Sequence, residues 1–316
     1  MSSFIIRKLL MMIPMTIIVS IVVFFAMRLS PVDPLLYAVS PDQMNSGNID
    51  ELRASMGLDD PIIIQYLRWV ADMATGNFGY SIQSGESIAS IYATRLPATL
   101  QLTLIALLIS SIVGITLGLL AASFKNRLPD YAARGISVIG AAIPEFFIGI
   151  IVLQIFAYWL GWFPSGGRLE PGSTSAWDSI PNMILPVLTL SFGMLAVLIR
   201  YTRSSALDVI GKEYVKTARS KGISESRVFF SHVLRNALGP VLIVLVLRLP
   251  ILVGGSVLIE TIFRWPGIGR VIVTSVASSD YPVIMATTLL IAVAILIASF
   301  LIDIVKAALD PRIRLS

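Results

Sequence analysis

Long apolar runs alternate with shorter polar segments along most of this chain of 316 residues. A helix needs about 20 mostly apolar residues to cross the hydrocarbon core of a bilayer, which is roughly 30 Å thick. The pattern therefore predicts an all-α integral membrane protein with six transmembrane helices. We expect these helices near residues 9–29, 99–123, 135–160, 181–199, 238–262 and 283–305.

The first apolar run follows Arg7 and Lys8, as the apolar core of a secretory signal peptide follows a basic start. This run is longer than such a core and has no cleavage site between small residues. It ends in Arg28 and the sequence SPVDP. We therefore expect residues 1–29 to stay in the protein as an N-terminal anchor helix.

Residues 30–98 form a polar segment that is too long for a simple turn. In it, GNIDELRASMGL predicts a short helix that stops at Gly57, and a second helix is expected from Pro61 to Gly76. The apolar residues of the second helix recur at helical spacing; they are Ile63, Tyr66, Leu67, Val70 and Met73. We expect a small helical cap outside the membrane, and a loop without fixed structure is the alternative.

Basic residues are distributed unevenly between the polar segments. With the N-terminus inside, most Lys and Arg residues fall in inner segments, above all in residues 200–235, whereas the outer segment 30–98 is acidic. Cytoplasmic loops of membrane proteins carry such an excess of Lys and Arg. The distribution predicts that both termini are cytoplasmic.

The most strongly charged stretch lies between the fourth and fifth apolar runs. A helix over 209–221 places its apolar residues along one stripe; they are Val209, Ile210, Tyr214, Val215 and Ala218. Gly222 suits a left-handed helix end, and Ser224 is able to cap a second helix from Glu225 to about Leu238. We expect a helix–turn–helix at the cytoplasmic face that contacts a partner protein. A basic helix lying on anionic lipid is the alternative.

The composition supports a membrane protein, because 56% of the residues are hydrophobic and only 14% are charged. The net charge of +5 reflects the inner loops and does not indicate a nucleic-acid partner. There is no cysteine, and the single histidine, His232, has no second histidine with which to bind a metal. The phosphate-binding sequence GxxxxGK[ST] is absent. We therefore expect no cofactor and no catalytic site.

The segment EYVKTARSKGISESRVFFSHVLRNALGP resembles the cytoplasmic signature loop of ATP-binding-cassette (ABC) importer permeases of the dipeptide/oligopeptide/nickel family. Glu213, Ala218 and Gly222 match its Glu–Ala–Gly frame, and NALGP at 236–240 matches its closing segment. Further similar segments occur in order along the chain: IIRKLLMMIPMTIIVSIVVFFAMRLSPVDP, GLDDPIIIQYLRWV, GNFGYSI, RLPATLQLT, GLLAASFKNRLPD, LPVLTL, IFRWPGIGR, DYPVI and DPRIR.

Three residues depart from the family pattern. Val32 stands where Gly is usual, Asn77 where Asp is usual, and Arg248 where a neutral polar residue is expected. The last departure leaves the class of cargo open.

The resemblance implies the type I ABC importer permease fold, with six transmembrane helices and an extracytoplasmic helical insertion after the first. It divides the chain into an anchor helix (1–29), a cap (30–98), a five-helix transport core that includes a cytoplasmic loop at 200–237 (99–308), and a C-terminal tail (309–316). The protein would be a multi-pass permease of the bacterial inner membrane without enzymatic activity.

The same resemblance implies the function and the partners. The permease would import di- or oligopeptides, and nickel complexes, glutathione and sugars are alternative cargoes. Its partners would be a second permease, expected to be a paralogue, two ATPase subunits, and an extracytoplasmic solute-binding protein. The helix at 209–221 would couple the permease to the ATPase. The expected coupling residues are Glu213, Tyr214, Lys216, Ala218, Arg219 and Gly222, with Ala218 and Gly222 allowing close approach of the partner.

Ionisable residues inside membrane spans are costly and are therefore functional candidates. Glu145, Arg248 and Asp303 are three such residues. The expected translocation-path residues are Arg248, Glu145, Gly254 and Gly255. We expect Arg248 to face a water-filled path and sense cargo charge; an internal pair with Glu145 or with a backbone carbonyl is the alternative.

Outer-face residues that are candidates for docking the binding protein are Arg264, Trp265 and Tyr281. Trp265 and Tyr281 equally suit an aromatic belt at the membrane interface. GITLG at 114–118 has the small-xxx-small spacing of close helix packing.

Two other functions are compatible with six spans. A transporter driven by an ion gradient would use Glu145, Arg248 and Asp303 as a relay, and a structural anchor would hold a protein at the outer face. Neither requires the patterned helical loop at 209–240, which therefore favours the importer permease.

Overall fold

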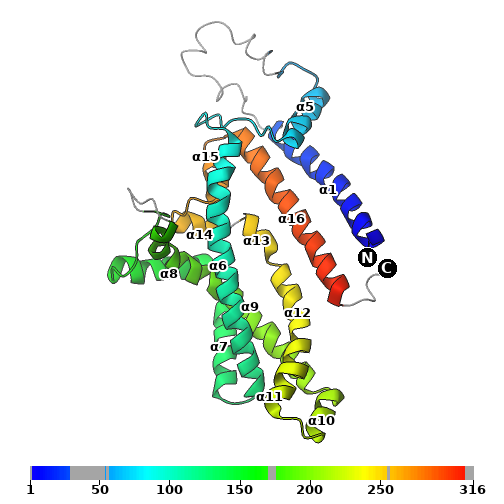
Figure 1. The fold of residues 1–316 in the computed structure, drawn as a ribbon. Coiled ribbons are helices and arrows are strands. Elements are labelled where there is room, and N and C mark those ends of the chain that lie inside the picture. The colour runs from blue at the N-terminus through cyan, green and yellow to red at the C-terminus, as the bar shows by residue number, and fades with distance from the viewer. Residues whose placement is uncertain (1, 29–53, 55–56, 170–175, 255–256, 310–316) are drawn as a thin grey trace.

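The computed structural model describes residues 2–28, 54, 57–169, 176–254 and 257–309. Over these ranges the regular secondary structure is helical, apart from an isolated antiparallel bridge between Tyr80 and Ser87. The helices, labelled in Figure 1, are α1 (Ser2–Arg28), α5 (Ile62–Thr75), α6 (Ile88–Ser123), α7 (Leu128–Ala142), α8 (Glu145–Val152), η1 (Leu153–Trp159), η2 (Ala176–Ser179), α9 (Ile180–Ile210), α10 (Glu213–Ser220), α11 (Glu225–Val228), η3 (Phe229–Leu234), α12 (Arg235–Val246), α13 (Leu249–Gly254), α14 (Val257–Ile262), α15 (Ile268–Ala277) and α16 (Tyr281–Leu309).

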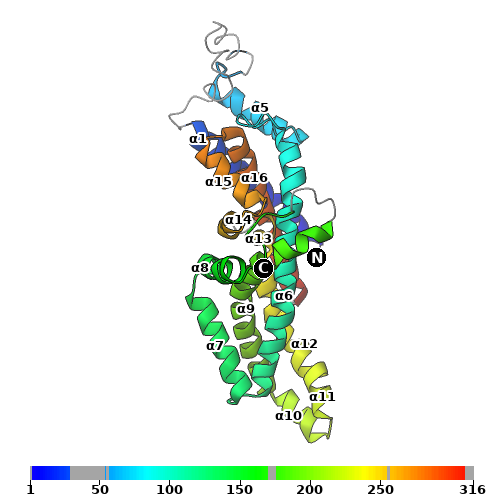
Figure 2. The same cartoon turned by 90° about the vertical axis from the view of Figure 1, so that its left-hand side faces the viewer.

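The described helices form an elongated molecule (Figures 1 and 2). Helices α10 and α11 lie at one extremity, which we call the α10 end, and α5 lies at the other, the α5 end. The long helix α6 runs through much of the distance between them. A helix of its 36 residues is about 54 Å long at 1.5 Å per residue, which exceeds the thickness of the hydrocarbon core. Part of α6 therefore projects into water.

Five described helices are long and apolar enough to cross a membrane. They are Ile5–Arg28, Ile88–Ser123, Ile180–Ile210, Glu225–Val246 and Tyr281–Ala307, and the bent pair Leu128–Ala142 and Glu145–Trp159 supplies a sixth span. The described residues therefore contain five spans, and the predicted number of six is reached when the bent pair is counted as one span. The fourth helix continues well past the expected residue 199, and the second begins before residue 99.

The third predicted span, 135–160, is wrong as a single straight helix because the chain bends by 100° between α7 and α8. Pro144 has no N–H to bond within a helix, and it disfavours the helical conformation of the residue before it. Accordingly, Ile143 is extended, with φ −97° and ψ 126°. Glu145 then begins α8 in a new direction.

The fifth predicted span, 238–262, is also wrong in its bounds. The continuous helical stretch covers Glu225–Val246 and ends in a turn at Leu247 and Arg248. Pro250 cannot donate the hydrogen bond that would continue α12, and it takes the second position of the short helix α13. The apolar run therefore forms one long helix followed by two short helices, α13 and α14.

Helix α9 is the most buried of the five long helices, and α6 and α7 pack against it. Gly114 and Gly118 of α6 make the close approach possible. A Cβ atom at Gly118 would lie 2.6 Å from Thr202 Cβ and 2.9 Å from the Ile199 carbonyl oxygen. The small-xxx-small motif is thus an internal packing contact.

The N-terminal helix lies against the C-terminal one, and it carries α5 at its far end. Lys8 of α1 forms an ion pair with Asp303 of α16 at 2.7 Å. At the α5 end, the hydroxyls of Ser20 and Tyr66 share a hydrogen bond of 2.8 Å, and Phe24 packs edge-on to Tyr66. These contacts hold α5 across the end of α1.

The prediction of a helix between Pro61 and Gly76 is confirmed, and Gly76 ends it with a φ of 82°. Of its predicted apolar stripe, Tyr66, Val70 and Met73 are half-buried, whereas Ile63 and Leu67 are exposed. The shorter helix expected over residues 47–58 falls largely outside the described residues.

Candidate functional site

The charged loop folds as a compact helical platform at the α10 end. The predicted helix over 209–221 is wrong in its bounds, because α9 continues to Ile210 and a turn separates it from α10, which begins at Glu213. The acidic side chain of Glu213 suits the positive end of the helix dipole. Gly222 adopts a φ of 75°, which reverses the chain into α11. The predicted turn at Gly222 is thus confirmed. Ser224 occupies the N-cap position of α11, but its side chain makes no capping hydrogen bond.

One face of α10 is buried in the protein's own core. Val215 and Ala218 belong to a cluster that also contains Leu119 of α6, Val209 of α9 and Val228 of α11. Val215 is fully buried. Helix α10 is therefore seated on the ends of α6 and α9 by apolar packing.

The opposite face of α10 is polar and exposed. Lys216 pairs with Glu213 at 2.8 Å, and Arg219 pairs with Glu225 of α11 at 2.8 Å. Tyr214 lies between Glu213 and Lys216 in the sequence and exposes 46% of its surface. The ion pairs hold the charged side chains within the loop while leaving them accessible.

This arrangement shows that the role expected for Ala218 is wrong. It was expected to allow a partner to approach closely, but only 6% of its surface is exposed because it packs inward. A residue that the sequence analysis missed is Phe230, which lies in η3 near the same end and is 62% exposed. Its neighbours Val228 and Val233 are buried, and that apolar spacing was the available signal.

A buried ion pair fixes the turn between α6 and α7 to α9 near this platform. Asp130 is fully buried and accepts a hydrogen bond from Arg203 Nη2 at 3.0 Å. Its carboxylate also accepts from the backbone N–H of Asn126 at 2.9 Å, where φ is 60°. The sequence analysis counted Arg203 as a loop charge and did not predict this pair.

Glu145 and Arg248 lie at the two helix breaks. Glu145 starts α8 at the 100° bend, and its carboxyl group lies against Gly193 of α9, where any side chain would collide with it. Arg248 lies in the turn between α12 and α13 and interacts electrostatically with Glu145. Among the described residues neither side chain has a hydrogen bond or a direct ion pair. The structure thus brings together opposite charges that are not in contact.

The other path candidates are distributed differently. Gly254 ends α13 and lies next to Ile291 of α16, whereas Gly255 lies outside the described residues. Asp303 is paired with Lys8, and no contact joins it to Glu145 or Arg248 in the described part of the chain.

A buried glutamate, Glu260, joins three elements toward the α5 end. It accepts hydrogen bonds from Thr99 Oγ1 of α6 at 2.8 Å and from the backbone N–H of Arg270 in α15 at 3.0 Å. Gly267 lies directly against it, because a Cβ there would lie 2.4 Å from both Glu260 Oε1 and Thr99 Oγ1. The carboxylate therefore caps the start of α15. The sequence analysis missed Glu260 because it counted the residue as the end of a span.

The two roles expected for Trp265, docking of the binding protein and an aromatic belt at the membrane interface, are both wrong. Its side chain is fully buried, and its indole N–H donates to the Ala98 carbonyl at 2.9 Å. It therefore cannot present a surface to a docking protein. Arg264 is exposed, with a φ of 50°, and Tyr281 is half-buried beside a cavity of about 570 Å³ between α1, α5 and α16.

Comparison with known protein families gives two matches that together span nearly the whole chain. Residues 114–315 match the binding-protein-dependent transport system inner membrane component, and residues 1–103 match the N-terminal part of such membrane components. The chain belongs to the binding-protein-dependent ABC permease family. The resemblance expected from the cytoplasmic loop is therefore confirmed.

Several similar proteins are full-length relatives. The oligopeptide transport system permease protein AppB of Bacillus subtilis (strain 168) is 40% identical over 316 residues, which cover 99% of each chain. The glutathione transport system permease protein GsiC of Escherichia coli (strain K12) is 37% identical over 314 residues, again 99% of each. A putative peptide permease of Brucella ovis is 37% identical over 313 residues, or 98% of each.

The fold agrees with a solved transporter. A crystal structure of an amino acid ABC transporter with histidines matches 72% of this chain and 94% of the other, with a TM-score of 0.50 at 15% identity. The protein is thus a multi-span inner-membrane permease with the type I ABC importer fold, and its relatives are transport permeases and not enzymes. Permeases of this family act with a partner permease, ATPase subunits and a binding protein.

Proposed function

We propose that this permease imports di- or oligopeptides and that α10 couples it to an ATPase subunit. The observation that carries the coupling proposal is that α10 has one buried face and one exposed face. Val215 and Ala218 fix it to the spans, while Glu213, Tyr214 and Lys216 remain exposed. A rigid element seated on two spans is able to transmit a partner's movement to both.

The orientation follows from this proposal. The α10 end and both termini would face the cytoplasm, and α5 would lie on the outer face. The excess of basic residues at 200–235 supports this orientation. The ion pair between Lys8 and Asp303 also supports it, since it holds the start of α1 beside the end of α16.

The peptide cargo is supported by the relatives. AppB is named for oligopeptide transport, GsiC for glutathione and the Brucella protein for peptides. Glutathione is itself a peptide, so the three names share one chemical class. We propose a paralogous permease as the partner, with two ATPase subunits on the α10 side and a binding protein on the other.

Glu145 and Arg248 are proposed to line the translocation path. Both lie at helix breaks, each is half-buried, and each lacks a direct partner among the described residues. A peptide carries an ammonium group and a carboxylate, so two separated opposite charges match its two ends. For docking of the binding protein, Arg264 and Tyr281 remain candidates.

The ion-gradient alternative is less well supported. It requires Asp303 in a relay with Glu145 and Arg248, but Asp303 forms its ion pair with Lys8. The test is peptide uptake by proteoliposomes that contain the complete importer. Uptake is expected to require both the binding protein and an active ATPase. Uptake that persists with an inactivated ATPase would contradict the proposal and favour the gradient-driven transporter.

A further inference from the structure

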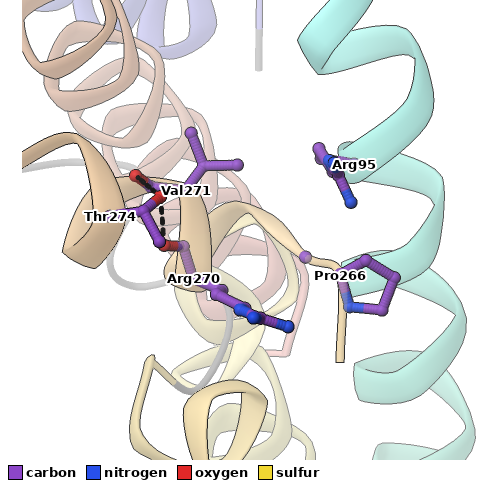
Figure 3. Close-up of a pocket in the computed structure, with 6 residues that line it drawn as sticks. Arg95, Pro266, Arg270, Val271 and Thr274 are labelled. Atoms are coloured by element: carbon purple, nitrogen blue, oxygen red, sulfur yellow. Dashed lines mark hydrogen bonds between the residues drawn. The ribbon is translucent and has the colours of Figure 1, made fainter. Parts of the chain in front are cut away.

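Two arginines flank a small pocket in the outer part of the core. Arg95 of α6 and Arg270 of α15 line a cavity of about 270 Å³, and the remaining lining residues are Pro266, Gly267, Val271 and Thr274. Among the residues that the structure describes, no acidic side chain lines it. In Figure 3, the side chains of Arg95 and Arg270 extend toward Pro266 from two different helices, α6 and α15.

The backbone segments that carry the two arginines are joined by a buried network of hydrogen bonds. Arg95 lies one turn before Ala98 and Thr99, which bind Trp265 and Glu260 respectively. The backbone N–H of Arg270 donates to the same Glu260 carboxylate. One network therefore joins the two helices that carry the guanidinium groups, so the walls of the pocket keep a constant spacing while the Arg95 side chain is free to turn toward a ligand.

The positive charge of the pocket is not neutralised by the part of the chain that the structure describes. Arg95 is exposed and has no hydrogen-bond or ion-pair partner there. Arg270 donates through Nη1 to the Arg264 carbonyl at 3.0 Å, and it also has no acidic partner. Even if the buried Glu260 beneath Gly267 is counted as charged, two cations face one anion. The pocket therefore attracts an anionic group.

The size and position of the pocket restrict what it holds. It is smaller than sites that enclose a whole small molecule, which occupy about 300–1,000 Å³. Arg95 also precedes the apolar run of α6, so the pocket lies in water outside the hydrocarbon core, on the side opposite α10. A guanidinium group binds a carboxylate through two parallel hydrogen bonds.

Resting on the proposed function, we infer that Arg95 and Arg270 bind the C-terminal carboxylate of the peptide cargo as it leaves the binding protein. Every linear peptide with a free C-terminus carries this group whatever its side chains are. The site would thus receive cargoes of different sequence by one shared end. The cargo's remaining residues would extend out of the pocket toward the path.

The experiment compares two cargoes in proteoliposomes that contain the complete importer. One cargo is a peptide with a free C-terminus and the other is the same peptide as its C-terminal amide, each presented on fully loaded binding protein. Arg95→Gln and Arg270→Gln are each expected to reduce uptake of the free acid about tenfold, because each removes charge-assisted hydrogen bonds. Uptake of the amide should stay within about twofold of wild type.

Two further variants serve as controls. Arg95→Lys keeps the charge without the bidentate geometry and should retain part of the discrimination. Arg68→Gln removes another exposed arginine, on α5, whose surface ion pair with Asp60 contributes about 1 kcal/mol or less. It should leave the ratio of the two uptake rates unchanged. Arg270→Gln removes the hydrogen bond to the Arg264 carbonyl and could disturb the segment before α15. In that case the result for Arg95→Gln decides the test, because the Arg95 side chain has no hydrogen bond or ion pair among the described residues.

A second measurement identifies the source of the carboxylate. The affinity of the loaded binding protein for the importer in nanodiscs should be unchanged by both Gln variants. A loss of that affinity would show that the pocket binds an acidic residue of the binding protein, and it would overturn the inference. An equal fall in uptake of acid and amide would also overturn it. If the wild-type importer took up neither peptide, the proposed function itself would fail.

Discussion

Replacing Val215 by Ala tests whether α10 is held by its buried face. The side chain is fully buried, so the substitution removes two methyl groups from a packed cluster. At about 0.8 kcal/mol per buried carbon, with a further cost for the cavity, seating of α10 should weaken by about 2 kcal/mol. The equilibrium between the seated and released helix would then shift by about 30-fold toward release.

Hydrogen–deuterium exchange of the purified importer measures this equilibrium directly. The backbone amides of α10 (Glu213–Ser220) should exchange up to about 30-fold faster in the Val215→Ala protein, since local opening controls their exchange. Peptide transported per ATP hydrolysed should fall, because a released helix transmits less movement to the spans.

Tyr214→Ala is the matched control, because Tyr214 is the preceding residue but lies on the exposed face. It should leave the exchange rates unchanged and weaken binding of the ATPase subunit. The reasoning is refuted if the amides of α10 exchange at the wild-type rate in Val215→Ala. That result would mean that other contacts hold the helix.

Three further predictions concern packing, a buried charge and the path. Gly118→Ala should lower the melting temperature, because its Cβ would collide with Thr202 of α9, whereas Gly135→Ala, which meets no atom within 4 Å, should leave it unchanged or raised. Asp130→Ala should cost about 3 kcal/mol, measured by denaturant unfolding, because it leaves Arg203 without its partner; a cost below about 1 kcal/mol would contradict this. Arg248→Gln should change the relative uptake of acidic and basic peptides without loss of assembly, and wild-type selectivity would exclude Arg248 from the path.

Local signals predicted much of the helical structure. Pro61 and Gly76 bound α5 as expected, and Gly222 turns the chain after α10, because proline and glycine act through the backbone of their own segment. The apolar stripe of the loop correctly placed Val215 and Ala218 on one face of the helix, but it wrongly included Tyr214, which is exposed. It did not show which face meets the core, because that depends on where α6 and α9 end in space.

Features that depend on tertiary contacts were not predictable in the same way. Hydropathy predicts residues 238–262 as one span, because the mean hydropathy of an apolar run is the same whether the run forms one continuous helix or several shorter ones. Trp265 was assigned to the surface because the partner of its indole N–H, the carbonyl of Ala98, is 167 residues away in the sequence. Arg203 lies 73 residues from Asp130, and Thr99 lies 161 residues from Glu260, so no local pattern marks these two carboxylates.

The capping of α15 by Glu260 also constrains how the permease opens and closes. One carboxylate joins α6, α14 and α15, so we expect these three elements to move together during each transport cycle. The flexing has to take place where backbone hydrogen bonding is already interrupted. The bend before Glu145 and the turn at Arg248 are two such positions, and each carries a charge. Under the proposal that Glu145 and Arg248 line the translocation path, the residues that meet the cargo would also lie at the hinges, so that passage of the cargo would be coupled to the hinge angle.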